Sequence, residues 1–126
     1  MVDAIDEMAC ANVREFALAL YAAHRFDTDP TLSRGKHYYS YPAHWFYGTQ
    51  CCIYTRQVAS DLADFISLHG TLKNDAPYDI LAKEYFCAWQ NVYTTHPSLV
   101  QHVGWTSSGL GAMHQSPAFG MTNAKQ

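Results

Sequence analysis

The sequence predicts a small α/β domain in which helices flank a mixed sheet. Three segments carry apolar residues at helical spacing, and several shorter apolar or aromatic runs have the length and composition of strands. The signals follow one another in the order helix, strand, strand, helix, helix, strand. A chain of 126 residues is long enough for one domain with its own core, and neither an internal repeat nor a linker divides it. We therefore expect a single domain over residues 1–126.

The first half of the chain contains one predicted helix and two predicted strands. The helix spans residues 8–25 and is followed by a polar loop over 26–35, in which a proline and a glycine break regular structure. An aromatic strand is expected over 36–41. The run 49–54 is apolar on both faces, which favours a buried, central strand. The apolar residues that predict the helix are Ala9, Val13, Phe16 and Leu20.

The second half begins with the clearest helical pattern in the chain. A helix is expected over 55–70, with a threonine at the N-cap position and a glycine at its end. A second helix, over 77–90, opens with a proline. Two short strands are expected at 92–95 and 98–103, and the tail over about 107–126 should be irregular because its apolar residues show little periodicity.

Composition excludes several classes of protein. Only 15% of the residues are charged and the net charge is -3, so the chain lacks the basic surface that nucleic-acid binding requires. No run approaches the ~20 apolar residues of a membrane span, and the N-terminus lacks the features of a signal peptide. We therefore expect a cytoplasmic protein without a nucleic-acid partner.

The four cysteines do not form a metal-binding or redox motif. They are Cys10, Cys51, Cys52 and Cys87, and no two of them have the C-x-x-C spacing. Cys51 and Cys52 stand in an apolar run, where we expect buried free thiols.

Aromatic side chains gather in residues 38–47, which include four of the nine tyrosines as well as Trp45. Such rings can line a sugar or base site, because a ring face stacks on apolar C–H patches while hydroxyls remain available for hydrogen bonds. They also favour strands. Both interpretations remain open: a carbohydrate- or protein-binding surface, or an aromatic strand and its turn.

Acidic residues stand at two predicted helix starts. Asp6 and Glu7 precede the first helix, and Asp79 lies in the first turn of the third. Carboxylates at these positions can simply complement the helix dipole. A first-turn aspartate can also face the cleft at the strand ends of an α/β sheet and act there as a general base. The tripeptide Asp27–Asp29 is a further acidic candidate, more typical of a turn than of a cation site.

His102 is the most informative histidine. It lies in the run Pro97–Gly104, where an apolar, strand-like stretch passes into a loop of small and polar residues. Enzymes of the α/β class often place functional side chains at such a position. His102 is either a partly buried structural residue or a ligand. The chain has no H-E-x-x-H motif or paired histidines at helical spacing, so a self-contained zinc site is not expected.

Three motifs in this order resemble the C-terminal half of a GT-A type glycosyltransferase. They are Trp45–Gln50 before a strand and helix, Pro77–Asp79 at a helix start, and Pro97–Gly104 with Ser107–Ser108 behind it. The resemblance covers roughly residues 3–119 and implies the acceptor-side half of that fold.

The resemblance also implies roles for individual residues. Asp79 would act as the catalytic base, His102 would complete the shell of a divalent metal ion, and Asp6 with Glu7 would stand for the acidic metal-binding motif of the family. The acceptor side would be lined by Trp45, Gly48, Thr49 and Gln50.

The activity implied is transfer of a sugar from a nucleotide-sugar donor to a hydroxyl acceptor, with manganese or magnesium on the departing diphosphate. The nucleotide-binding half of the family has no counterpart here. Three explanations stay open: a truncated product, a degenerate relative, or a piece that works only with a partner chain, and the isolated chain could be inactive. Two alternatives stay open: a non-catalytic carbohydrate- or protein-binding module that uses the aromatic residues 38–47, and a small α/β protein of another activity.

Overall fold

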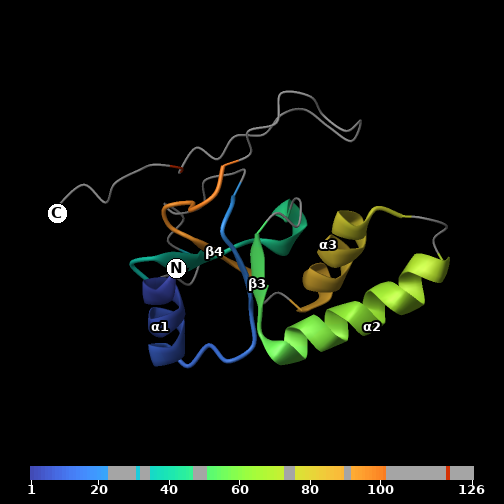
Figure 1. Ribbon diagram of the computed structural model, residues 1–126, viewed down its shortest axis with the longest axis horizontal. Helices are drawn as coiled ribbons and strands as arrows, with labels where there is room; N and C mark the ends of the chain where they lie inside the picture. The colour runs from blue at the N-terminus through green and yellow to red at the C-terminus, as the bar shows by residue number, and fades with distance from the viewer. Residues whose placement is uncertain are drawn as a thin grey trace.

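The structure is a computed structural model that describes residues 1–22, 31, 35–46, 51–72, 76–89, 92–101 and 119. In these ranges the chain forms a small α/β domain with three helices and an open, four-stranded mixed sheet (Figure 1). The helices are α1 (Val2–Cys10), α2 (Arg56–Leu72) and α3 (Tyr78–Trp89), with a short 3-10 helix η1 (Ala43–Trp45). The strands are β1 (Ala17–Ala19), β2 (Tyr38–Ser40), β3 (Cys52–Tyr54) and β4 (Val92–Thr95).

The sheet has the strand order β2-β4-β1-β3. Its two inner strands, β1 and β4, run parallel, with Leu18 opposite Tyr93. The outer strands are antiparallel to their neighbours: β3 pairs with β1, and β2 pairs with β4. The carboxyl ends of β1 and β4 therefore lie at the same edge of the sheet as the amino ends of β2 and β3.

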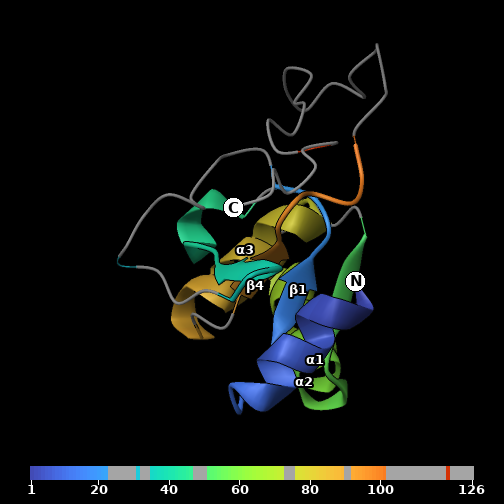
Figure 2. The same ribbon diagram turned by 90° about the vertical axis from the view of Figure 1, so that its left-hand side faces the viewer.

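Helices cover both faces of the sheet, with α1 on one side and α2 and α3 on the other (Figures 1 and 2). The alternation of side chains along each strand produces two separate apolar clusters. On the α2 and α3 side, Ala17, Tyr39 and Val92 pack with Leu62 and Phe86. The second cluster, on the α1 side, contains Ala4, Met8, Phe16, Leu18 and Tyr38.

The predicted helices at 55–70 and 77–90 are confirmed as α2 and α3, except that α2 continues past Gly70, its expected end, to Leu72. The predicted strands at 36–41 and 92–95 contain β2 and β4. Both helices present an apolar face to the sheet. Val58 and Leu62 of α2, and Leu81 and Tyr85 of α3, are buried.

The predicted helix over 8–25 is wrong, because the chain leaves helical structure at Cys10 and forms β1 from Ala17. Asn12 has a φ of 60° and lies just past the helix end. The N–H of Val13 donates to the carbonyl of Met8, and the N–H of Asn12 donates to that of Ala9, which is the Schellman pattern of a helix end. The apolar run that follows is contiguous, and it suits an inner strand covered on both faces.

The central strand predicted at 49–54 is also corrected. The strand β3 is at the edge of the sheet, and its three residues are only partly buried. Of the two thiols expected to be buried, Cys51 is exposed and Cys52 is half-buried. In the strand predicted at 98–103, the described residues 98–101 are not in a strand.

Candidate functional site

Three parts of the chain meet at the end of β1, around Leu20. The N–H of Leu20 donates to the carbonyl of Cys51 at 3.0 Å. The carbonyl of Leu20 accepts from the N–H groups of Leu99 and Val100, at 2.9 and 3.2 Å. We call this arrangement the Leu20 junction; it fixes the chain just before β3 and the chain just after β4 to the same inner strand.

A side chain strengthens the same junction. The N–H of Ala22 donates to the Ser98 hydroxyl oxygen at 3.3 Å, and the Ser98 side chain is buried. Farther back, the N–H of His96 donates to the carbonyl of His37, which joins the carboxyl end of β4 to the start of β2. In open α/β sheets, the carboxyl ends of parallel strands form the usual ligand-binding edge.

Four residues with predicted roles lie outside the described residues: Gly48, Thr49, Gln50 and His102. The tripeptide Asp27–Asp29 lies outside them as well. However, Gln50 directly precedes Cys51 in the chain, and His102 directly follows Gln101. The Leu20 junction therefore holds the described chain next to Gln50 and the described chain next to His102 against the same inner strand.

Trp45 and Asp79 lie on elements of the same side of the sheet. Trp45 belongs to η1, the residue is 38% exposed, and its carbonyl accepts a hydrogen bond from the Tyr41 hydroxyl. The 3-10 helix η1 contacts α3, where the ring of Phe46 lies 5.0 Å from that of Phe86. Asp79 is partly exposed in the first turn of α3, and its Oδ1 accepts the N–H of Ile80 at 3.1 Å.

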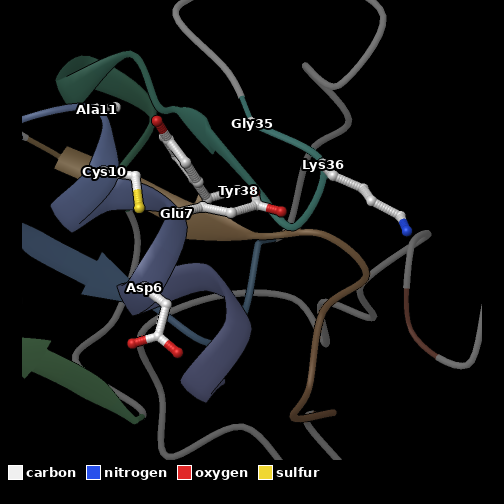
Figure 3. A pocket seen from close by; sticks show the side chains of 7 residues that line it. All are labelled: Asp6, Glu7, Cys10, Ala11, Gly35, Lys36 and Tyr38. Carbon is white, nitrogen blue, oxygen red and sulfur yellow. The ribbon is translucent and has the colours of Figure 1, made fainter.

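Asp6 and Glu7 belong to α1, on the opposite face of the sheet from Asp79. They line an open pocket of about 480 Å³ between α1 and the chain that enters β2 (Figure 3). Figure 3 shows the Glu7 carboxylate directed toward Gly35 and the Asp6 carboxylate directed away from it. The other lining residues are Cys10, Ala11, Lys36 and Tyr38. The structure therefore does not bring Asp6 or Glu7 together with Asp79.

The Glu7 carboxylate is bound by the chain that enters β2. Its Oε2 accepts the backbone N–H of His37 at 3.0 Å, and its Oε1 lies 2.8 Å from Nδ1 of the same residue. Burial on its own raises the pKa of the Glu7 carboxyl, but the hydrogen bonds from His37 and Lys36 outweigh it, so the pKa is lowered. Burial, with a smaller effect of the Glu7 charge, raises the pKa of Tyr38.

Among the residues that the structure describes, no group of three or more histidine, cysteine, aspartate or glutamate side chains is close enough to hold a metal ion. A shell completed by His102 involves a residue outside the described ranges and stays a prediction.

The aromatic residues at 38–47 are mostly core. Tyr38, Tyr39, Tyr41 and Phe46 are each no more than 4% exposed. Among the described residues of this segment, Trp45 alone combines a large ring with an exposed surface, and the ring of His44 lies 5.5 Å from it. The described part of this segment therefore forms a strand and its turn, with one indole at the surface.

Sequence reasoning missed the contributions of His37 and Gly35. The backbone approach at Gly35 leaves no space for a side chain, since a Cβ there would lie against the Glu7 carboxylate and 2.5 Å from Cε1 of Tyr38. Gly35 appeared in the sequence only as a loop breaker.

Comparison of the chain with models of known protein families, with curated proteins and with solved structures finds no match in any of the three. No helix in the described ranges is long and apolar enough to cross a membrane. The described part of the chain is thus a small α/β domain with three helices and an open, four-stranded mixed sheet.

Proposed function

We propose that this chain forms the acceptor side of a metal-dependent glycosyltransferase, which transfers a sugar from a nucleotide-sugar donor to a hydroxyl. The Leu20 junction is the observation that supports this most. It joins the described residues next to Gln50 to the described residues next to His102, at the sheet edge where α/β folds bind ligands. Two of the three motifs that resemble the family thus adjoin one inner strand.

In this proposal Asp79 is the general base. Its carboxylate would take the proton of the acceptor hydroxyl as the oxygen attacks the anomeric carbon, and the nucleoside diphosphate would depart. Gly48, Thr49, Gln50 and Trp45 would hold the acceptor. Asp79 and Trp45 lie on elements in mutual contact, since η1 packs against α3.

A divalent cation, manganese or magnesium, would neutralise the charge that develops on the departing diphosphate. The proposal assigns His102 to this ion and leaves out Asp6 and Glu7. The reason is geometric: Glu7 is already bound to His37, and α1 covers the other face of the sheet from α3. The pocket for the nucleotide base would be supplied by another segment or chain.

Calorimetry tests the proposal on this chain. A nucleoside diphosphate should bind in the presence of Mn²⁺ and bind more weakly in its absence. The variant His102→Ala should lose the dependence on the metal, whereas His69→Ala should keep it, because His69 lies on α2 with its ring 4.2 Å from that of Phe65. Absence of binding under both conditions would contradict the proposal for this chain.

The exposure of Trp45 favours a second candidate, a non-catalytic module that binds carbohydrate or protein. An exposed indole beside an imidazole can stack on the apolar face of a sugar ring. The two candidates differ in a pair of variants. A binding module predicts that Trp45→Ala weakens binding of an oligosaccharide or protein partner while Asp79→Ala leaves it unchanged, and an enzyme predicts loss of sugar transfer in Asp79→Ala.

A further inference from the structure

Two cysteines stand side by side where the chain enters β3. Cys51 is exposed and has a φ of 54°, and Cys52, the first residue of β3, is half-buried. All four cysteines of the chain are free thiols. The other two, Cys10 and Cys87, are exposed on α1 and α3, which cover opposite faces of the sheet.

The backbone at this position differs from a regular strand. In a strand, successive side chains point to opposite faces, which would separate two adjacent sulfur atoms. Cys51 precedes β3 and has a left-handed backbone, so this alternation does not extend to it. The left-handed backbone at Cys51 therefore does not impose the separation of the two sulfur atoms that a regular strand would impose.

Cys52 is held in place by its surroundings. It packs against the apolar cluster on the α2 and α3 side, as does Tyr54 of the same strand. Burial is the main cause that raises the pKa of Cys52 to about 11. Cys52 is therefore a protonated thiol at neutral pH, and the exposed Cys51 is the sulfur that meets a dissolved reagent first.

We propose that Cys51 and Cys52 form a vicinal dithiol that a peroxide converts to a reversible disulfide. The Cys51 sulfur attacks one oxygen of hydrogen peroxide, the O–O bond breaks, and sulfenic acid and one water molecule form. The Cys52 sulfur then attacks the sulfenic sulfur and loses its proton, and the hydroxyl leaves as a second water molecule. The two thiols are oxidised by two electrons, and the peroxide is reduced to two waters.

The spacing of the two residues makes this disulfide easy to reduce. Cα atoms joined by a trans peptide are about 3.8 Å apart, which is shorter than the spacing of ordinary disulfides. A strained disulfide has a more oxidising potential and is typical of labile or regulatory bonds. Closure would act on the backbone whose carbonyl accepts the Leu20 N–H. This inference does not depend on the proposed sugar transfer.

Mass spectrometry of the full chain tests the proposal. The reduced protein is treated with hydrogen peroxide, and the remaining thiols are alkylated. The monomer should lose two hydrogen atoms and take up alkyl groups on Cys10 and Cys87 only. The loss should disappear in Cys51→Ser and in Cys52→Ser, and persist in the matched controls Cys10→Ser and Cys87→Ser. Treatment with dithiothreitol should restore all four thiols.

A trivalent arsenical provides a measurement that needs no oxidant. Phenylarsine oxide should form one adduct per chain by bridging both sulfurs, and each of the variants Cys51→Ser and Cys52→Ser should lose it. The proposal is overturned if Cys51 oxidises to sulfinic acid or joins two chains while Cys52 stays open to alkylation. It is equally overturned if the arsenical does not bridge the pair in the folded protein.

Discussion

Both carboxylate oxygens of Glu7 in α1 contact His37, the residue that precedes β2. One oxygen accepts the backbone N–H at 3.0 Å and the other lies 2.8 Å from Nδ1. The two residues are 30 positions apart in the chain. The contact fixes the entry of an outer strand to the only helix on that face of the sheet within the described ranges.

Replacing Glu7 with glutamine should destabilise the fold by about 1 kcal/mol, because an amide offers one acceptor oxygen instead of two and carries no charge. The side chains of His37 and Glu7 are 28% and 31% exposed, so solvent screens part of the interaction. The free energy of unfolding measured in urea checks this. Asp6→Asn is the matched control, since Asp6 is an exposed acid on the same helix. Equal losses in the two variants would contradict a specific role for Glu7.

The stabilisation by Glu7 should depend on pH. Its pKa in the folded protein lies below the ordinary value of 4.5 that applies to the unfolded chain. A depressed pKa means that the contribution is fully present above pH 4.5 and is lost as the pH falls through the lower pKa of the folded state. The difference in unfolding free energy between the wild type and Glu7→Gln should therefore shrink with acidification. If this difference instead grows below pH 4.5, the pKa of Glu7 is not lowered in the folded protein and the prediction is wrong.

Alanine should have opposite effects at two glycines. At Gly35, a Cβ would lie against Glu7 and 2.5 Å from Cε1 of the buried Tyr38 ring. We expect Gly35→Ala to destabilise the protein by about 1–3 kcal/mol through overpacking. In Gly70→Ala the new Cβ would lie 3.7 Å from Cδ1 of Leu81, an ordinary contact, and α2 should gain up to about 1 kcal/mol. Thermal melts of both variants measure whether the stability falls or rises. A Gly35→Ala variant that is more stable than the wild type would contradict the close contact of Gly35 with Glu7 and Tyr38.

The sequence predicted the elements whose signals are local. Both α2 and α3 have an apolar stripe within their own residues, so no distant contact is needed to define them, although the glycine expected to end α2 lies inside it. For β1 the local signal was ambiguous, because the residues that follow Val13 fit helical spacing as well as a buried strand. The deciding facts are the Schellman end at Asn12 and the pairing of β1 with β3 and β4, which lie far along the chain.

The candidate site, too, could be predicted from the sequence only in part. The sequence singled out Asp79 and Trp45, and the structure places them on contacting elements. The family resemblance placed Glu7 and Asp79 in one site, but a resemblance between motifs says nothing of the face on which each helix packs. The bond between Glu7 and His37 could not be predicted either, since it forms only after α1 has packed on the sheet.

Removal of the Ser98 hydroxyl should loosen the Leu20 junction. In Ser98→Ala, the N–H of Ala22 loses an acceptor in a buried position, and an unsatisfied buried donor costs about 1–3 kcal/mol. We expect urea unfolding to show a loss within this range, while Ser60→Ala, at an exposed position of α2, should change stability by less than about 0.5 kcal/mol. The junction holds the described residues that precede His102. Mn²⁺-dependent binding of a nucleoside diphosphate should therefore also weaken in Ser98→Ala and not in Ser60→Ala. If the affinity for the nucleoside diphosphate stays unchanged while the stability falls as expected, the Leu20 junction has a structural role only and the sugar-transfer site lies elsewhere.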